Sequence, residues 1–275
     1  MPNVTANGIQ IEYDTFGDPS SPPLLLIMGA GAQMIMWREA FCDLLASQGL
    51  YVIRFDNRDV GLSSKLDDIP YKLDDMADDA VGLLDALGIE KAHILGTSLG
   101  GMIAQTIAIR HPSRVWSLIS MTSTTGGPAL PQGKPEVFAL LFSPAPAERE
   151  AQIEHSVNFY MHLGGSKYPS DEQEIRGMIE QSYDRCFYPQ SVKRQAEAVM
   201  MSGPRTEALK SVTAPTLVIH GSEDPIFPVE HGRATASAVP GAELLIVEGM
   251  GHLFPVEVWP LLVDAIVRHT HKEGS

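Results

Sequence analysis

The sequence predicts an α/β protein in which helices cover both faces of a mostly parallel β-sheet. Three observations favour this class. Short apolar runs, typical of buried strands, alternate with segments that have one apolar helical face. One of these runs leads through a glycine-flanked serine directly into a helical segment. A long stretch, residues 126–210, has helical patterns and no strand pattern, which indicates an insertion between two strands.

The composition of the chain limits the kinds of molecule that it is expected to bind. The chain has 275 residues, which suits one large domain or one domain with an insertion. The net charge of -14 argues against nucleic acid and anionic membrane surfaces. Cys42 and Cys186 lie far apart and lack metal-ligand spacing, so we expect two free thiols in a reducing compartment. We see no signal peptide and no membrane-spanning run, and we expect a cytoplasmic protein.

The first part of the chain begins with a predicted hairpin. Residues 4–6 and 9–16 have strand patterns and are joined by Asn7-Gly8, a dipeptide suited to a tight turn. Residues 23–27 form a continuous apolar run, as in a strand buried on both faces. The other elements expected before residue 126 are helices over 37–48, 73–87 and 101–109 and strands over 51–55, 92–95 and 115–121.

The second part contains the insertion and then returns to the strand pattern. Prolines punctuate a loop-rich entry, and helical patterns follow near 147–163, 170–185 and 189–202. We therefore expect a core domain of residues 1–125 and 211–275 and a helical cap of residues 126–210, at the sheet edge where ligands bind. The last expected elements are strands over 215–220 and 242–247 and helices over 229–239 and 255–269.

Residues 96–100, Gly-Thr-Ser-Leu-Gly, are the stretch around which the chemistry is organised. A serine with glycines two positions away on each side, between a strand and a helix, is typical of a nucleophile elbow. Side chains at 96 and 100 would collide with neighbouring elements in so tight a turn. The helix N-terminus beside Ser98 would favour a developing negative charge. The alternative is a glycine-rich loop that only packs.

A serine nucleophile needs a base, and the base needs an orienting carboxylate. Among nine histidines, His252 differs because it follows a late strand in a loop with two glycines, which we expect to be mobile. Asp224 directly follows the strand over 215–220 and is the expected acid, whereas the adjacent Glu223 would point away. The alternatives are a solvent-facing His252 and an Asp224 that only caps the turn before Pro225.

An oxyanion hole needs two backbone N–H groups directed at the developing charge. We expect one from Leu99, which follows the nucleophile, and one from Ala30, with Gly29 as the alternative. Residues 56–63 are rich in charge, but we interpret them as a structural turn in which Arg58 and Asp59 tie loops together. We therefore expect no metal ion and no cofactor.

Several motifs together support a resemblance to a known family. Five motifs occur in the order seen in the α/β-hydrolase superfamily and cover most of the chain outside the insertion. They are MGAG with Trp37 downstream, FDNRDVGLSS, GTSLGG, HGSEDP and GMGH. The sequence resembles capped bacterial esterases of the aclacinomycin methylesterase type, which also have MG where many relatives have HG. The resemblance implies an eight-stranded sheet, a helical cap, and a triad of Ser98, Asp224 and His252.

The expected activity is hydrolysis of a carboxylic ester through an acyl-enzyme. A serine at the elbow argues against haloalkane dehalogenases and epoxide hydrolases, which resemble this fold but have an aspartate there. The alternative activities that use the same triad are those of lactonases, thioesterases, C–C hydrolases and cofactor-free perhydrolases. A non-catalytic ligand-binding receptor on the same scaffold is a further alternative. The sequence does not indicate an oligomeric state.

An apolar pocket between cap and core is expected to select the substrate. Apolar side chains concentrate in the cap and beside the predicted catalytic loops, which favours a small, neutral, largely apolar ester as the partner. The residues expected to line this pocket are Gly29, Met34, Trp37, Phe138, Phe142, Phe159, Phe227 and Leu253.

Overall fold

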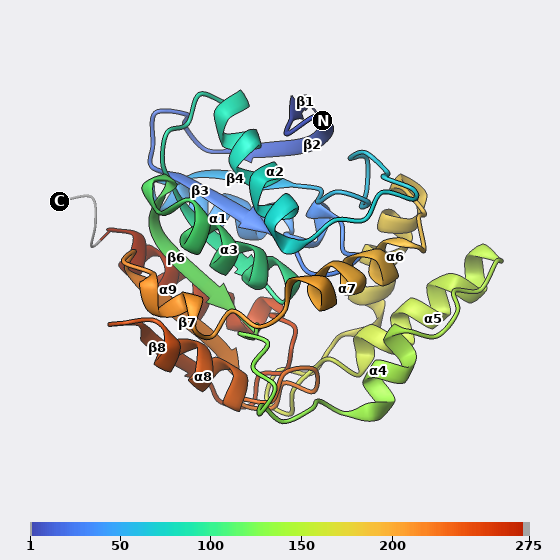
Figure 1. Ribbon diagram of the computed structural model, residues 1–275. Helices are drawn as coiled ribbons and strands as arrows, with labels where there is room; N and C mark the ends of the chain where they lie inside the picture. Colours follow the sequence, from blue (N-terminus) through green and yellow to red (C-terminus); the bar gives the residue numbers. More distant parts are fainter. Residues whose placement is uncertain (1, 272–275) are drawn as a thin grey trace.

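A computed structural model describes residues 2–271 and contains one eight-stranded sheet (Figure 1). The strand order is β1-β2-β4-β3-β5-β6-β7-β8. The β1/β2 and β2/β4 pairs are antiparallel and every other pair is parallel, so the expected mostly parallel sheet is confirmed. The strands are β1 (Asn3–Ala6), β2 (Ile9–Phe16), β3 (Pro23–Ile27), β4 (Tyr51–Phe55), β5 (Ala92–Thr97), β6 (Val115–Met121), β7 (Thr216–Gly221) and β8 (Glu243–Val247).

Helices pack on both faces of the sheet. Successive side chains along β3 point to opposite faces and contact different helices. Leu25 and Ile27 pack against α2 and α3, while Leu24 and Leu26 pack against α1 and α9 on the other face. All four side chains are fully buried. The helices of the core are α1 (Glu39–Ser47), α2 (Leu73–Ala86), α3 (Leu99–Arg110), α8 (Glu230–Ala238) and α9 (Trp259–His271).

Four helices, α4 (Pro135–Leu141), α5 (Arg149–Met161), α6 (Glu172–Arg185) and α7 (Ser191–Ser202), lie between β6 and β7 in the chain. Figure 1 shows them gathered at one end of the sheet. Helix α4 corrects the expectation of a purely loop-rich entry. Its first residue is Pro135, whose fixed φ and missing N–H are compatible with the first turn of a helix.

Short 3-10 turns change the expected start of two helices. The helix expected from residue 37 begins at Glu39, because η1 (Met34–Met36) precedes it and Trp37 ends that turn. The last helix begins at Trp259 after η4 (Val256–Val258). The other such turns are η2 (Pro112–Arg114) and η3 (Ala208–Ser211).

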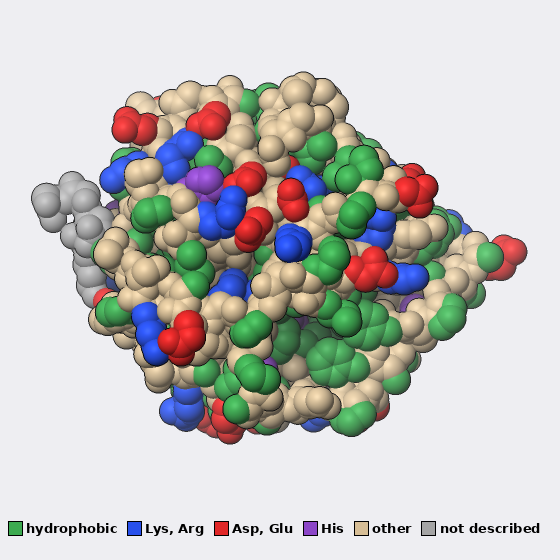
Figure 2. Space-filling view, viewed as in Figure 1, with side chains coloured by type: hydrophobic (Ala, Val, Ile, Leu, Met, Phe, Trp, Pro, Cys, Tyr) green, Lys and Arg blue, Asp and Glu red, His purple; other side chains and the backbone are tan. Residues whose placement is uncertain are grey.

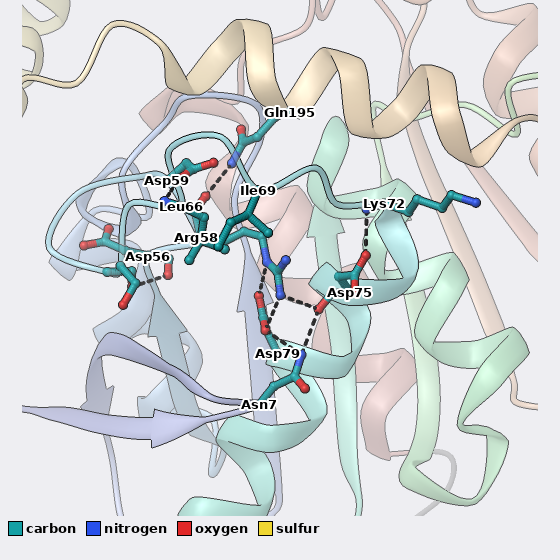
Figure 3. A network of polar contacts seen from close by, with 12 residues as sticks. Asn7, Asp56, Arg58, Asp59, Leu66, Ile69, Lys72, Asp75, Asp79 and Gln195 are labelled. Carbon is teal, nitrogen blue, oxygen red and sulfur yellow. Dashed lines mark hydrogen bonds and ion pairs between the residues drawn. The ribbon is translucent and has the colours of Figure 1, made fainter.

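The turn over residues 56–63 ties the core to the inserted helices. Arg58 forms an ion pair with Asp79 of α2, with 2.6 Å between Nε and Oδ2 (Figure 3). Asp59 pairs with Arg194 of α7 at 2.6 Å. Asp56 pairs in the same way with Arg185 of α6, at 2.7 Å. The segment is a turn, as interpreted from the sequence, but Arg58 and Asp59 form ion pairs with residues of helices α2 and α7 and not with other loops.

The cysteines agree with the expectation of two free thiols. Cys42 is buried and Cys186 is half-buried, and neither forms a disulfide. Burial raises the pKa of the Cys42 thiol to about 12, so this thiol stays protonated and unreactive. None of the helices within residues 2–271 is both long enough and apolar enough to cross a membrane.

His93 on β5 makes the stability of the fold depend on pH. The side chain is 3% exposed, and burial lowers its pKa to about 4. The unfolded chain therefore takes up a proton near pH 6.5, while the native chain takes it up only near pH 4. We expect the free energy of unfolding to fall by about 3 kcal/mol as pH drops through this window. Urea titrations should show this slope flattened in His93→Gln and retained when the exposed His162 is replaced by Gln.

Candidate active site

Ser98 lies at the turn between β5 and α3. Its backbone has a φ of 56° and a ψ of -121°, in a region that residues other than glycine rarely adopt. Two hydrogen bonds hold this turn. The Ser98 N–H donates to the carbonyl of Met121 at 3.0 Å, and the Ser123 hydroxyl donates to the Ser98 carbonyl at 2.7 Å. The Ser98 side chain is half-exposed at the N-terminus of α3.

Close approach of the backbone explains the two flanking glycines. A Cβ at position 96 would lie 1.9 Å from the carbonyl oxygen of Gly100. One at position 100 would lie 2.0 Å from the carbonyl oxygen of Ile27. Backbone atoms cannot yield at such distances, so any larger residue would break the turn. The collisions expected from the sequence are therefore confirmed.

Asp224 lies in the loop after β7 and His252 in the loop after β8, and their side chains are in contact. The His252 Nδ1 lies 2.7 Å from the Asp224 Oδ2. The other oxygen, Oδ1, accepts the N–H groups of Ile226 and Phe227, both at 2.9 Å. Because an ionised carboxylate only accepts hydrogen bonds, Nδ1 carries the proton and Nε2 is left as an acceptor. Asp224 therefore holds the imidazole in the tautomer that a general base requires.

The loop that contains His252 is held by the connection between α5 and α6. The His252 N–H donates to the carbonyl of Leu163 at 2.8 Å. A Cβ at Gly251 would lie 2.2 Å from the same oxygen. The Lys167 N–H also donates to the carbonyl of Gly249, at 3.1 Å. The expectation of a mobile loop is thus corrected: these two glycines allow the loop to pack against residues 163–167.

Two neighbours of Asp224 form their hydrogen bonds with other residues, although the His220 Nε2 also lies 3.6 Å from the Asp224 Oδ2. Glu223 points away from His252, as expected, and accepts the N–H and the hydroxyl of Ser166, both at 2.6 Å. These hydrogen bonds lower the pKa of Glu223. His220 is buried behind Asp224 and donates from Nε2 to the carbonyl of Phe227 at 2.7 Å. Burial lowers the pKa of His220, which keeps this imidazole neutral.

Ser98 and His252 line the same cavity from two loops. Within residues 2–271, no hydrogen bond joins the Ser98 hydroxyl to the imidazole. In free enzymes such bonds are often long and tighten only when a substrate is bound. The contact between Asp224 and His252 is therefore already formed, whereas a contact between Ser98 and His252 would have to form across the cavity.

The backbone around Ser98 offers the expected N–H donors. Leu99 is the first residue of α3, so its N–H belongs to the first helical turn, where donors lack partners within the helix. Ala30 lies in the loop after β3, and its N–H has no acceptor in the described part of the chain. Gly29 packs against the nucleophile, since a Cβ there would lie 3.2 Å from the Ser98 Cβ.

Gln195 on α7 is a residue that the sequence analysis missed. Its side chain is fully buried. The Oε1 accepts the N–H of Gly31 at 2.8 Å. The Nε2 donates to the carbonyl of Arg58 at 3.1 Å (Figure 3). One amide thus fastens the loop that contains Ala30 to the turn at Arg58. The helical spacing of the buried residues Ser191, Gln195 and Ala198 is the signal that could have revealed it.

The cavity above Ser98, called the main cavity below, has a volume of about 410 Å³ and a largely apolar wall. Figure 2 shows a hollow bordered by hydrophobic side chains on this side of the molecule. Arg38 is the only lysine or arginine among the described residues that line it, and it forms an ion pair with Glu174 at the wall. The residues of the expected pocket that line it are Gly29, Phe138, Phe142, Phe159, Phe227 and Leu253.

The expectation that Met34 and Trp37 line the pocket is wrong. Both side chains are fully buried in the core. Trp37 packs against Phe41 and Phe254, with ring centroids 5.9 and 5.0 Å apart. The backbone of Met34 is held by Asp56, whose Oδ1 accepts its N–H at 2.8 Å. The 3-10 turn places Met36, rather than Met34 or Trp37, on the wall of the main cavity.

Comparison with known proteins agrees with this architecture. The family model of the alpha/beta hydrolase fold matches residues 22–257, and the chain belongs to this family. A rhodomycin D methylesterase of Streptomyces sp. (strain C5) is 32% identical over 97% of both chains. A 2-hydroxymuconate semialdehyde hydrolase of Pseudomonas sp. (strain CF600) is 31% identical over 86% of this chain and 82% of its own.

Solved structures support the same fold. A meta-cleavage product hydrolase from Pseudomonas fluorescens IP01 superimposes with a TM-score of 0.84 at 23% identity, covering 100% of this chain and 98% of its own. An enol-lactonase from Burkholderia xenovorans LB400 gives a TM-score of 0.82 at 23% identity, covering 98% of this chain and 100% of its own. At such identities the likeness concerns the fold alone.

Proposed function

We propose that the protein hydrolyses a carboxylic ester of a small, neutral, largely apolar substrate through an acyl-enzyme. One observation carries the proposal. A serine in a strained backbone turn faces the same cavity as an imidazole whose Nδ1 is held 2.7 Å from a buried carboxylate. This is the arrangement that activates a hydroxyl for acyl transfer.

In the proposed reaction, the Ser98 Oγ attacks the ester carbonyl carbon while the His252 Nε2 takes the hydroxyl proton. The N–H groups of Ala30 and Leu99 stabilise the oxyanion that forms. Asp224 stabilises the imidazolium. Collapse of the tetrahedral intermediate breaks the C–O bond of the ester, and His252 gives the proton to the departing alcohol. Water, deprotonated by His252, then releases the acid and regenerates Ser98.

The class of enzyme has independent support. The protein is a carboxylic ester hydrolase by its family and by its similarity to rhodomycin D methylesterases. Other relatives are 2-hydroxymuconate semialdehyde hydrolases. The main cavity favours neutral substrates because Arg38 is paired with Glu174 and Asp171 adds a second carboxylate to the wall.

We also propose that residues 126–210 act as a cap over a core of residues 1–125 and 211–275. Side chains from α4, α5, α6 and α7 line the main cavity opposite Ser98. The ion pairs from α6 and α7 to Asp56 and Asp59 support a cap that is fastened to the core.

A substrate panel tests the proposed function. It should contain p-nitrophenyl esters of rising acyl length, methyl esters, a lactone, a thioester, a peracid-forming assay and a dienoate with a cleavable C–C bond. We expect hydrolysis of neutral esters, with kcat/KM at least about tenfold above that of an ester carrying a carboxylate. Preferred cleavage of the dienoate or the lactone would contradict ester hydrolysis as the main activity, and tight binding without turnover would indicate a receptor.

The cap should set the length of the acyl chain that is accepted. Phe138 and Phe159 contribute rings to the wall of the main cavity. Replacing either by alanine removes a large apolar side chain and lengthens the space for substrate. We expect the optimum in acyl length to shift upward by about two carbons, with a smaller change in the rate on the shortest ester. Equal changes for all esters would contradict this role of the cap.

Gln195 should position the oxyanion hole without touching the substrate carbonyl. In Gln195→Leu the Gly31 N–H and the Arg58 carbonyl both lose their partner. We expect kcat to fall by about tenfold or more because the Ala30 donor is less well oriented, while KM changes less. Gln190→Leu, at the exposed start of α7, is the control. A change in KM alone would contradict this positioning role.

A further inference from the structure

A second cavity, called the side chamber, lies beside the main cavity under the inserted helices. Its volume is about 210 Å³. It reaches from the exposed Phe187 to Ala30, in the loop beside Ser98. The two cavities share a wall, so a substrate bound at Ser98 has the side chamber as its neighbour. The shared residues are Ala30, Ala32, Met36, Leu141, Phe159 and Tyr160.

The side chamber differs from the main cavity in chemical character. Hydroxyl, amide and imidazole groups from α5 and α6 form much of its wall, among them Gln152, His155 and Ser182. The one carboxylate on the described wall, Asp59, is paired with Arg194 at 2.6 Å. The chamber is therefore more polar than the main cavity, and its described wall has no unpaired carboxylate and no lysine or arginine, which suits a neutral ligand that forms hydrogen bonds.

Gln152 lies in the wall of this chamber and carries an unpartnered acceptor. Its Nε2 donates to the Ser156 hydroxyl at 3.1 Å, one turn along α5. Its Oε1 is buried and has no hydrogen-bond partner among the described residues. A buried carbonyl oxygen without a donor destabilises the fold unless a ligand or water supplies one. The group that fills this place must present an O–H or N–H.

Tyr160 lies in the wall that the main cavity and the side chamber share. Its ring packs edge-on against Phe159, with centroids 5.4 Å apart. Its hydroxyl has no hydrogen-bond partner in the described part of the chain, although the residue lines both cavities. Burial raises the pKa of this hydroxyl to about 12, so it stays a proton donor throughout the neutral range.

We propose that the side chamber is a binding subsite for a neutral portion of the substrate that carries a hydroxyl or N–H group. The apolar part of the ester lies in the main cavity, and the polar portion passes Tyr160 and donates to the Gln152 Oε1. This inference rests on the proposed ester hydrolysis at Ser98. It adds a second requirement to the substrate: a hydrogen-bond donor set apart from the ester group by an apolar spacer.

The test separates binding from catalysis by using the Ser98→Ala protein. The probes are hexyl butanoate and its ω-hydroxyhexyl counterpart, with butyl and octyl pairs to vary the reach. Isothermal titration calorimetry gives the Kd of each ester. We expect one hydroxylated ester to bind about fivefold more tightly than its plain partner, the value of one net hydrogen bond.

Adding Gln152→Leu to Ser98→Ala should bring that ratio of Kd values to about one, and Tyr160→Phe should lower it as a second, less disruptive change. The matched control is Gln173→Leu, on the exposed surface of α6, which should keep the ratio. Thermal melting checks that each protein is folded.

Equal binding of the plain and hydroxylated esters at every chain length would overturn the subsite, and so would a preference that survives both Gln152→Leu and Tyr160→Phe. Either result would mean that the chamber holds water only. Turnover of plain esters by the unmodified protein tests the proposed function separately, so the two failures are distinguishable.

Discussion

Ser98→Ala should abolish ester hydrolysis while the protein stays folded. The substitution removes the proposed nucleophile, and loss of a triad member costs about 10⁴- to 10⁶-fold in kcat. An alanine fits the turn, because the strain at this position lies in the backbone, with a φ of 56°, and serine already bears a Cβ there. The measurement is kcat on the best p-nitrophenyl ester, with circular dichroism as the check on folding.

The matched control is Ser211→Ala, at an exposed position outside the site, where the hydroxyl only donates to the carbonyl of Ala208. Its kcat should equal that of the unmodified protein. If Ser98→Ala keeps activity within about tenfold of the original, Ser98 is not the nucleophile.

Asp224→Asn should lower kcat by about 10⁴-fold. The asparagine keeps the size of the side chain but presents an amide to His252. The carboxylate that holds the proton on Nδ1 is lost, so the imidazole can adopt the wrong tautomer and can no longer be stabilised as an imidazolium. The contact at stake is the 2.7 Å hydrogen bond between Asp224 Oδ2 and His252 Nδ1.

Glu223→Gln is the neighbouring control. Glu223 is bonded to Ser166 and points away from the imidazole, so we expect a change in kcat of less than about fivefold. A larger loss in Glu223→Gln than in Asp224→Asn would mean that the assigned acid is the wrong carboxylate.

The sequence predicts the elbow well because each of its features has a local cause. Gly96 and Gly100 are needed where backbone atoms approach within about 2 Å of an added Cβ, and a short apolar strand and a helix flank them. The alternation of strands and helices also predicts the sheet. The acid and base follow from their places after β7 and β8, since parallel strands end at the same edge.

Other features depend on contacts between distant segments and have no local signature. Trp37 and Met34 lie next to a predicted loop of the site, but the 3-10 turn directs them into the core. The loop around Gly251 has the composition of a flexible loop, yet Gly251 packs directly against the carbonyl of Leu163. Gln195 has only the weak signal of its helical spacing with Ser191 and Ala198, and Gln152 has the same sequence signature as a surface glutamine; the fold shows that the Gln195 side chain and the Gln152 Oε1 are buried.

Covalent labelling tests the central claim most directly. The protein is incubated with a p-nitrophenyl alkylphosphonate, a stable mimic of the tetrahedral intermediate, and its peptides are mapped by mass spectrometry. We expect one phosphonyl group per chain, on the peptide that contains Ser98, with loss of ester hydrolysis in proportion to labelling. Labelling at another residue with the same loss of activity, or full labelling of Ser98 with activity retained, would contradict the assignment of Ser98 as the nucleophile.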